Sequence, residues 1–102
     1  MSRHDFSAIF ELYPMLIEQM LATFTSHDFI LSLARQYQML YVEALYTYRN
    51  VPTRQNPAPF QIVHGILAKH LNAHSSLVEY AGQTPSKDIF GEANMCALWR
   101  KI

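Results

Sequence analysis

The sequence predicts an α+β domain that is mainly helical and ends in a β-hairpin. Apolar residues recur every three or four positions through most of the first 74 residues, which is the spacing of helices that bury one face. The last quarter of the chain changes to short stretches of β-branched, aromatic and alternating residues, which favour strands. The 102 residues, 50% of them hydrophobic, suffice for one core and are too few for two.

The first predicted helix covers residues 5–23. Pro14 lies inside it, and a proline removes one backbone donor and crowds the carbonyl group of Phe10. The segment is therefore either one kinked helix or two helices, the second beginning at Pro14. Its apolar positions alternate spacings of four and three, as in a coiled-coil seam. We therefore predict a dimer contact through a stripe formed by Phe6, Phe10, Tyr13 and Ile17.

The second helical stretch is predicted over residues 27–49. Thr25 or Ser26 precedes it, and either hydroxyl can accept a hydrogen bond from a free amide at the helix start. The stretch contains no glycine or proline, and its apolar face is wide. It can be one helix of about twenty residues or two shorter helices joined near residues 36–38. Its tyrosines either pack in the core or form an exposed aromatic surface.

The third predicted helix covers residues 59–74 and follows a loop that is rich in proline and asparagine. A proline at the entry suits the first turn of a helix, whose first amides have no intrahelical partner in any case. We expect the core face of this helix to be formed by Phe60, Val63, Leu67 and Leu71.

Two strands are predicted to close the chain, over residues 76–81 and 95–102. The first is rich in residues that suit a pleated surface and is stopped by Gly82. The second is predicted from its alternating pattern. A polar loop over residues 83–94 joins them, and its only apolar pair is Ile89 and Phe90.

This order of elements, with helices followed by a proline-entered helix and a hairpin, resembles the winged helix-turn-helix family. The resemblance covers residues 26–102 and leaves residues 1–25 as an N-terminal helical extension of the same single domain. It implies that the helix over residues 59–74 lies in the major groove of DNA and that the hairpin loop contacts the DNA backbone. Other winged-helix domains bind proteins instead.

The resemblance implies double-stranded DNA as the partner and two sets of contacts. Bases would be read from the less apolar side of the third helix, by Gln61, His64, Lys69 and Asn72. Phosphates would be contacted by four basic side chains, those of Arg54, Lys87, Arg100 and Lys101. The alternative for the first set is a solvated helix face, since glutamine, lysine and asparagine are common surface residues.

The charge pattern supports a second hypothesis. The formal net charge is zero, which gives no overall field to attract nucleic acid. Up to Leu45 five acidic residues oppose two basic ones, and beyond it six basic residues oppose three acidic ones. The 13% of aromatic residues and the five methionines are more apolar material than a small domain readily hides. A non-catalytic protein-interaction module is therefore the alternative function.

No catalytic, metal or cofactor site is predicted. His70 and His74 have a spacing that can chelate a metal, but a structural zinc site needs four ligands and Cys96 has no second cysteine beside it. Cys96 lies in an alternating apolar strand, where a buried thiol is commoner than a nucleophile. The three glycines are too scattered for a phosphate-binding loop. We expect a protein that is not an enzyme.

The chain is predicted to be cytoplasmic. Its longest apolar run, residues 39–42, is far shorter than a membrane span, and no signal peptide is visible. A single cysteine cannot form an internal disulfide, which suits a reducing compartment.

Overall fold

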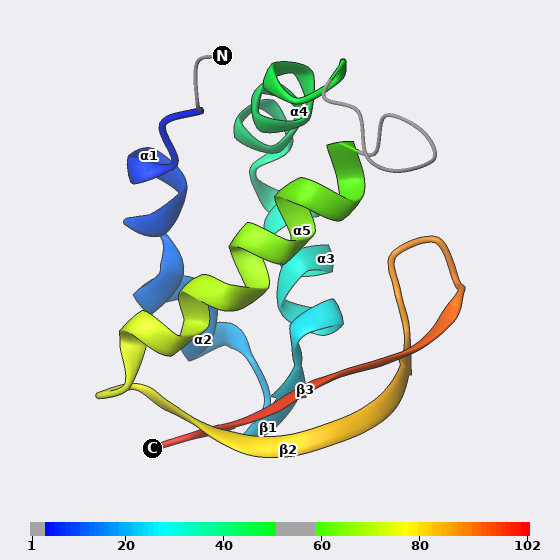
Figure 1. The fold of residues 1–102 in the computed structure, drawn as a ribbon. Helices are drawn as coiled ribbons and strands as arrows, with labels where there is room; N and C mark the ends of the chain where they lie inside the picture. The colour runs from blue at the N-terminus through cyan, green and yellow to red at the C-terminus, as the bar shows by residue number, and fades with distance from the viewer. Residues whose placement is uncertain (1–3, 51–58) are drawn as a thin grey trace.

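The computed structural model describes residues 4–50 and 59–102 of the chain (Figure 1). Within these ranges, five α-helices and one 3-10 turn pack with a three-stranded antiparallel sheet. The predicted α+β class with a C-terminal hairpin is therefore confirmed.

The N-terminal segment forms two short helices, α1 (Ser7–Phe10) and α2 (Tyr13–Gln19). Pro14 lies in the first turn of α2, where its missing N–H leaves no helical hydrogen bond unmade. α2 ends because Met20 adopts an extended backbone with ψ 159°, which leads into strand β1 (Thr23–Thr25). The first predicted helix was therefore too long at its C-terminal end.

The second helical stretch is divided into α3 (Ser26–Gln36) and α4 (Gln38–Thr47). Between them Tyr37 has φ −127° and ψ 56°, which lies outside the helical region, so the stretch is two helices. α3 begins with a capping box. The Thr25 hydroxyl accepts a hydrogen bond from the backbone N–H of Asp28, and the Asp28 carboxylate accepts one from the backbone N–H of Thr25, both at 3.0 Å.

The third helix, α5 (Pro59–His70), continues into a 3-10 turn, η1 (Leu71–His74). It lies across the front of the molecule in Figure 1 and packs on α3 and α4. Val63 and Leu67 form its buried face. The carbonyl oxygen of Leu67 accepts a hydrogen bond from the Tyr13 hydroxyl at 2.6 Å, which ties α2 to α5.

The hairpin consists of β2 (Val78–Lys87) and β3 (Ala93–Lys101), and β1 pairs with the other edge of β3, giving the order β1-β3-β2. Both strands are longer than predicted, and the loop between them is correspondingly shorter, covering residues 88–92. Gly82 does not end a strand. It lies in a β-bulge just after Tyr80, and its φ of +113° is a conformation that glycine adopts readily.

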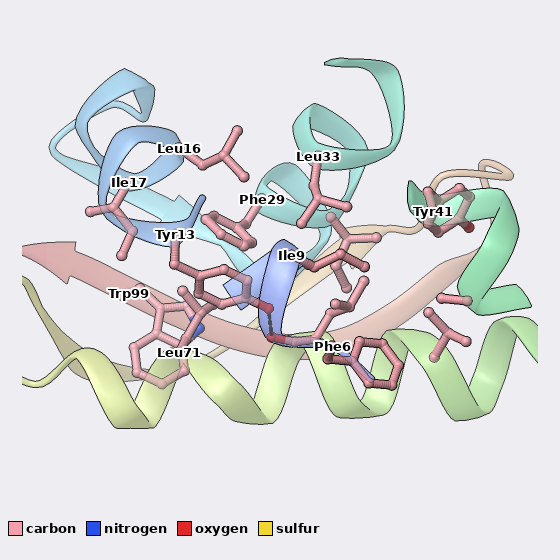
Figure 2. Packing of buried hydrophobic residues seen from close by; sticks show 14 of the residues in the cluster. Phe6, Ile9, Tyr13, Leu16, Ile17, Phe29, Leu33, Tyr41, Leu71 and Trp99 are labelled. Carbon is pink, nitrogen blue, oxygen red and sulfur yellow. Dashed lines mark hydrogen bonds between the residues drawn. The ribbon is translucent and has the colours of Figure 1, made fainter. Parts of the chain in front are cut away.

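Helices α1 and α2 and strand β1 belong to the same core as the rest of the chain. Phe24 of β1 lies opposite Trp99 in the β1–β3 register, and both side chains are buried. Ile9 and Leu16 are 1% and 0% exposed. Figure 2 shows side chains of α1 and α2 packed together with those of α3 and of the C-terminal segments.

The stripe predicted as a dimer contact is packed inside a single copy of the chain. Phe6, Tyr13 and Ile17 are 6%, 0% and 3% exposed. Phe10 is half-buried and stacks on the ring of His70, with ring centroids 3.5 Å apart. The predicted dimer contact does not agree with this packing, because the chain's own elements already cover these side chains. The periodicity indicated a buried face, but it carried no information on what covers that face.

Candidate functional site

A groove of about 850 Å³ lies between α5 and the β2–β3 hairpin. One wall is a side of α5, and the other is the hairpin with its loop. The first turns of α3 contribute to the lining through Ser26, His27 and Ile30. In Figure 1 strand β1 lies beside one end of the β2–β3 hairpin. The other end of the hairpin curves upward, so that its loop lies near the N-terminal end of α5.

The wall formed by α5 and η1 contains every base-reading residue predicted on the third helix, namely Gln61, His64 and Lys69 of α5 and Asn72 of η1. Gln61, Gly65 and Lys69 are exposed and follow one another at intervals of four, so they form a single stripe along the helix. At Gly65 the stripe has no side chain, and a Cβ placed there would meet no atom within 4 Å. The structure therefore brings the predicted residues together beside open space.

The hairpin wall carries aromatic, apolar and amide side chains that the sequence analysis did not assign to a site, namely Tyr80, Gln83, Asn94 and Met95. Tyr80 and Met95 are 54% and 58% exposed. Trp99 is buried, and its ring lies edge-on to Tyr80 with centroids 5.8 Å apart. The indole N–H of Trp99 donates to the Ser26 hydroxyl at 2.9 Å, which fixes the hairpin on the start of α3.

Phe60 of α5 and Phe90 of the hairpin loop meet where the two walls come together. Their ring centroids are 4.8 Å apart and the rings are nearly perpendicular, at 84°. Phe60 was expected on the core face of the third helix, and this prediction is wrong because its ring is 41% exposed and packs on the loop. The apolar pair formed by Ile89 and Phe90 in an otherwise polar loop was the sequence feature that could have indicated the contact.

Asp88 holds the hairpin loop in one shape. Its carboxylate accepts hydrogen bonds from the backbone N–H groups of Phe90 at 2.9 Å and Glu92 at 3.0 Å. Its own backbone N–H donates to the carbonyl of Glu92, and its carbonyl accepts from Gly91. These amide donors hold the pKa of Asp88 below its usual value, so its carboxylate is ionised at neutral pH.

His64 lies in the groove and contacts α4. Its Nε2 is 2.6 Å from the Tyr41 hydroxyl. Burial lowers the pKa of His64 and raises the pKa of Tyr41 to about 12, so both side chains are neutral at pH 7. His27 also lines the groove, and its Nδ1 is buried without a hydrogen-bond partner among the described residues. His64 thus offers the groove a polar surface without a full charge.

The side chains predicted to contact phosphate are spread over the molecule. Arg100 pairs with Glu79 on the neighbouring strand, with Nε and Oε1 2.6 Å apart. The Lys101 ammonium donates to two backbone carbonyls at the end of α2, at 3.0 and 3.1 Å. Lys87 is exposed at the loop end of β2. Arg54 lies outside the described residues.

The groove carries few charges. Among the described residues that line it, Lys69 is the one lysine or arginine, and Asp88 and Glu92 are the carboxylates. An anionic ligand therefore meets one full positive charge, on the α5 wall. Most other polar contacts come from amide, hydroxyl and imidazole groups.

The histidines considered for metal binding pack against aromatic rings of the N-terminal segment. His70 stacks on Phe10, and His74 stacks on Tyr13 with ring centroids 5.3 Å apart. Burial lowers the pKa of His70, and the neighbouring His74 adds to the shift. Within residues 4–50 and 59–102, no three His, Cys, Asp or Glu side chains are grouped so that they can hold a metal ion.

Comparison with known proteins gives the chain no relatives. No protein-family model, curated protein or solved structure matches it. Among the helices that the structure describes, none is long and apolar enough to cross a membrane.

Proposed function

We propose that the protein binds double-stranded DNA in the manner of a winged-helix domain, with α5 in the major groove and the β2–β3 hairpin as the wing. The observation that carries this proposal is the groove between these two elements, lined on α5 by the polar stripe. The chain order of α5, β2 and β3, with β1 on the far edge of the sheet, supports the winged-helix comparison.

The groove suits the passage of one DNA strand. A helix in the major groove and a hairpin against the adjacent backbone lie on either side of a sugar–phosphate chain, so open space is needed between them. Gly65 lies at the middle of the α5 stripe, where the absence of a side chain permits close approach of a backbone.

The side chains of the α5 wall match the chemistry of base edges. Gln61 carries a donor and an acceptor on one amide, which can engage the N6 and N7 positions of adenine. Asn72, in the η1 turn that follows α5, has the same group, and its Nδ2 also donates to the carbonyl of Lys69 at 3.2 Å. Lys69 can donate to O6 and N7 of guanine or to a phosphate. These three residues would give α5 and η1 their base preference.

Phosphate neutralisation is a small part of the proposed binding. Arg100 and Lys101 are engaged within the protein, which leaves Lys69 and Lys87 among the predicted contacts that the structure describes. Each neutralised phosphate contributes about 0.9 to the salt dependence, so Lys69 and Lys87 together should contribute about −2 to the slope of log K against log salt. This contribution is small for a DNA-binding domain.

The test is fluorescence anisotropy with a labelled duplex of about 20 base pairs, in roughly 50 to 200 mM salt. Lys69→Gln should weaken binding and reduce the slope by about 1. Arg35→Gln is the matched control, because Arg35 is an exposed arginine that does not line the groove. Absence of salt-dependent binding at micromolar protein would overturn the proposal.

A second candidate function, protein interaction, is favoured by α4. This helix buries Tyr41 and Ala44 on one side, while Met39, Val42 and Tyr46 are 74%, 55% and 62% exposed on the other. An exposed apolar stripe on one side of a helix suits a protein contact, including one with a second copy of the chain. Sedimentation velocity over a concentration series tests self-association, and Val42→Asp should abolish it.

A further inference from the structure

We infer that the end of the groove where Phe60 and Phe90 meet binds an unpaired nucleobase, which stacks on one of these two rings. The inference rests on the proposed function and gives the DNA partner a further property, a base outside the double helix. Stacking of a base would use the exposed rings of Phe60 and Phe90, which are not needed to read the base edges of a duplex. A phosphodiester strand has no need of exposed aromatic rings, whereas every base has a face that stacks on one.

The two rings are available for stacking. Phe60 and Phe90 are 41% and 58% exposed, although they touch each other at a centroid distance of 4.8 Å. Because the rings are nearly perpendicular, a base that stacks on one of them can meet the other with its edge, an arrangement that aromatic groups favour.

The loop that presents Phe90 is held in place before any ligand arrives. The Asp88 carboxylate accepts the backbone N–H of Phe90 itself, and two backbone hydrogen bonds of 2.9 and 3.0 Å close the turn. Gly91 has φ +82°, which allows the chain to reverse within five residues. Binding of a base to Phe90 therefore costs little conformational entropy in the loop.

Hydrogen-bonding groups for a base edge lie along the same groove. Gln61 follows Phe60 on α5, and Asn94 of β3 also lines the groove. Carboxamides pair with the edges of unstacked bases, which single-strand readers use for recognition. Tyr80 and Met95 continue the exposed apolar lining on the hairpin wall.

The charged residues of the groove indicate that the base and the phosphate bind at different ends of it. Asp88 and Glu92 lie in the loop beside Phe90, where a neutral base is tolerated better than a phosphate, so the phosphate contact of the wing is left to Lys87 at the end of β2. Lys69 is nine residues beyond Phe60 on α5, which is about 13 Å at the helical rise. The strand would therefore run from the aromatic end, which holds the base, toward Lys69, which receives a phosphate of another nucleotide.

The experiment compares three labelled DNA probes by fluorescence anisotropy. They are a fully paired duplex, the same duplex with an unpaired thymine bulge, and one strand alone. We expect the bulged duplex to bind about tenfold more tightly than the paired one. Phe90→Ala should remove this preference and leave the affinity for the paired duplex within about twofold. Leu21→Ala is the matched control, since Leu21 is an exposed apolar residue outside both the groove and the α4 stripe.

A second variant supplies a readout that does not depend on affinity. Phe90→Trp should retain the preference for the bulge, and its additional fluorescence should be quenched when a base stacks on the indole. Equal affinity for the paired and bulged duplexes, or an equal loss on both in Phe90→Ala, would overturn the inference and leave the DNA proposal standing. Absence of binding to all three probes would overturn both.

Discussion

The hydroxyl group of Tyr13 is buried and donates a hydrogen bond to the backbone carbonyl of Leu67 at 2.6 Å, and the phenol ring packs against Phe29 (Figure 2). The same ring also stacks on His74. Burial raises the pKa of Tyr13, so this hydroxyl keeps its proton at all ordinary pH values. The Tyr13 hydroxyl thus links α2 to the last turn of α5. Helix α5 in turn forms one wall of the groove.

Removal of this hydroxyl should destabilise the protein. Tyr13→Phe leaves the Leu67 carbonyl without the phenol donor in a buried place, which costs about 1–3 kcal/mol of unfolding free energy. Urea unfolding measures the change. Tyr46→Phe is the matched control, because Tyr46 is 62% exposed, and its effect should be within about 0.5 kcal/mol. Equal effects of the two changes would contradict the structural role of Tyr13.

Two histidines make stability depend on pH. Burial lowers the pKa of His64 and of His70, so the folded chain binds protons less readily than the unfolded chain does at these residues. Their stabilising contribution is fully present above the usual histidine pKa of about 6.5 and declines as the pH falls below it.

We therefore expect a lower unfolding free energy at pH 5.5 than at pH 7.5, as measured by urea titration at constant ionic strength. The double variant His64→Gln, His70→Gln should show a smaller difference between the two pH values. A wild-type protein that is equally stable or more stable at pH 5.5 would contradict the burial of these neutral imidazoles.

Two glycines in regular secondary structure differ in backbone conformation. Gly82 lies in the bulge of β2 with φ +113°, whereas Gly65 lies in the middle of α5. A Cβ added at either position would meet no atom within 4 Å, so backbone conformation alone decides the effect of a substitution.

Alanine should therefore have opposite effects at the two sites. Gly82→Ala forces a side chain into a strained φ and should destabilise the protein by about 1–3 kcal/mol. Gly65→Ala should stabilise it by about 0.5–1 kcal/mol, because alanine loses less backbone entropy in a helix than glycine does. Thermal unfolding of both variants tests the pair, and a change of the same sign in both would contradict the bulge.

The sequence predicted the helices better than the strands. Helix α5 and its polar stripe were predictable because proline, periodicity and polar residues all indicated the same element. Strand β1 was not, since Thr23 was assigned to the end of the first predicted helix and Thr25 to the start of the second, and its pairing with β3 is not visible in the local sequence. Gly82 suggested a strand end because a bulge depends on the partner strand, which local sequence does not show.

The candidate site was predicted on one wall only. Gln61, His64, Lys69 and Asn72 are close in sequence, so helical spacing was enough to group them. The hairpin wall comes from β2, β3 and their loop, and its position depends on how the hairpin curves toward α5. The phosphate contacts at Arg100 and Lys101 were chosen by charge type, and the structure gives both side chains partners within the protein.

For the whole molecule, the N-terminal helices are part of the stability of a single copy. Ile17→Ala should cost about 2–5 kcal/mol, because this side chain is 3% exposed in the core. The loss should be the same at two protein concentrations about tenfold apart, since a dimer contact would make the midpoint concentration-dependent. Leu21→Ala is the control, because Leu21 is 80% exposed. A midpoint that moves with concentration in the wild type but not in Ile17→Ala would restore the dimer interpretation.

The position of β3 at the centre of the sheet bears on the way the molecule folds during synthesis. β3 is the last element of these residues to be made, yet both other strands pair with it and not with each other. While the chain is still growing, β1 and β2 have no strand to join, and the helices can only assemble an incomplete core without Trp99. The β2–β3 hairpin, and with it the groove, forms only after β3 has been synthesised.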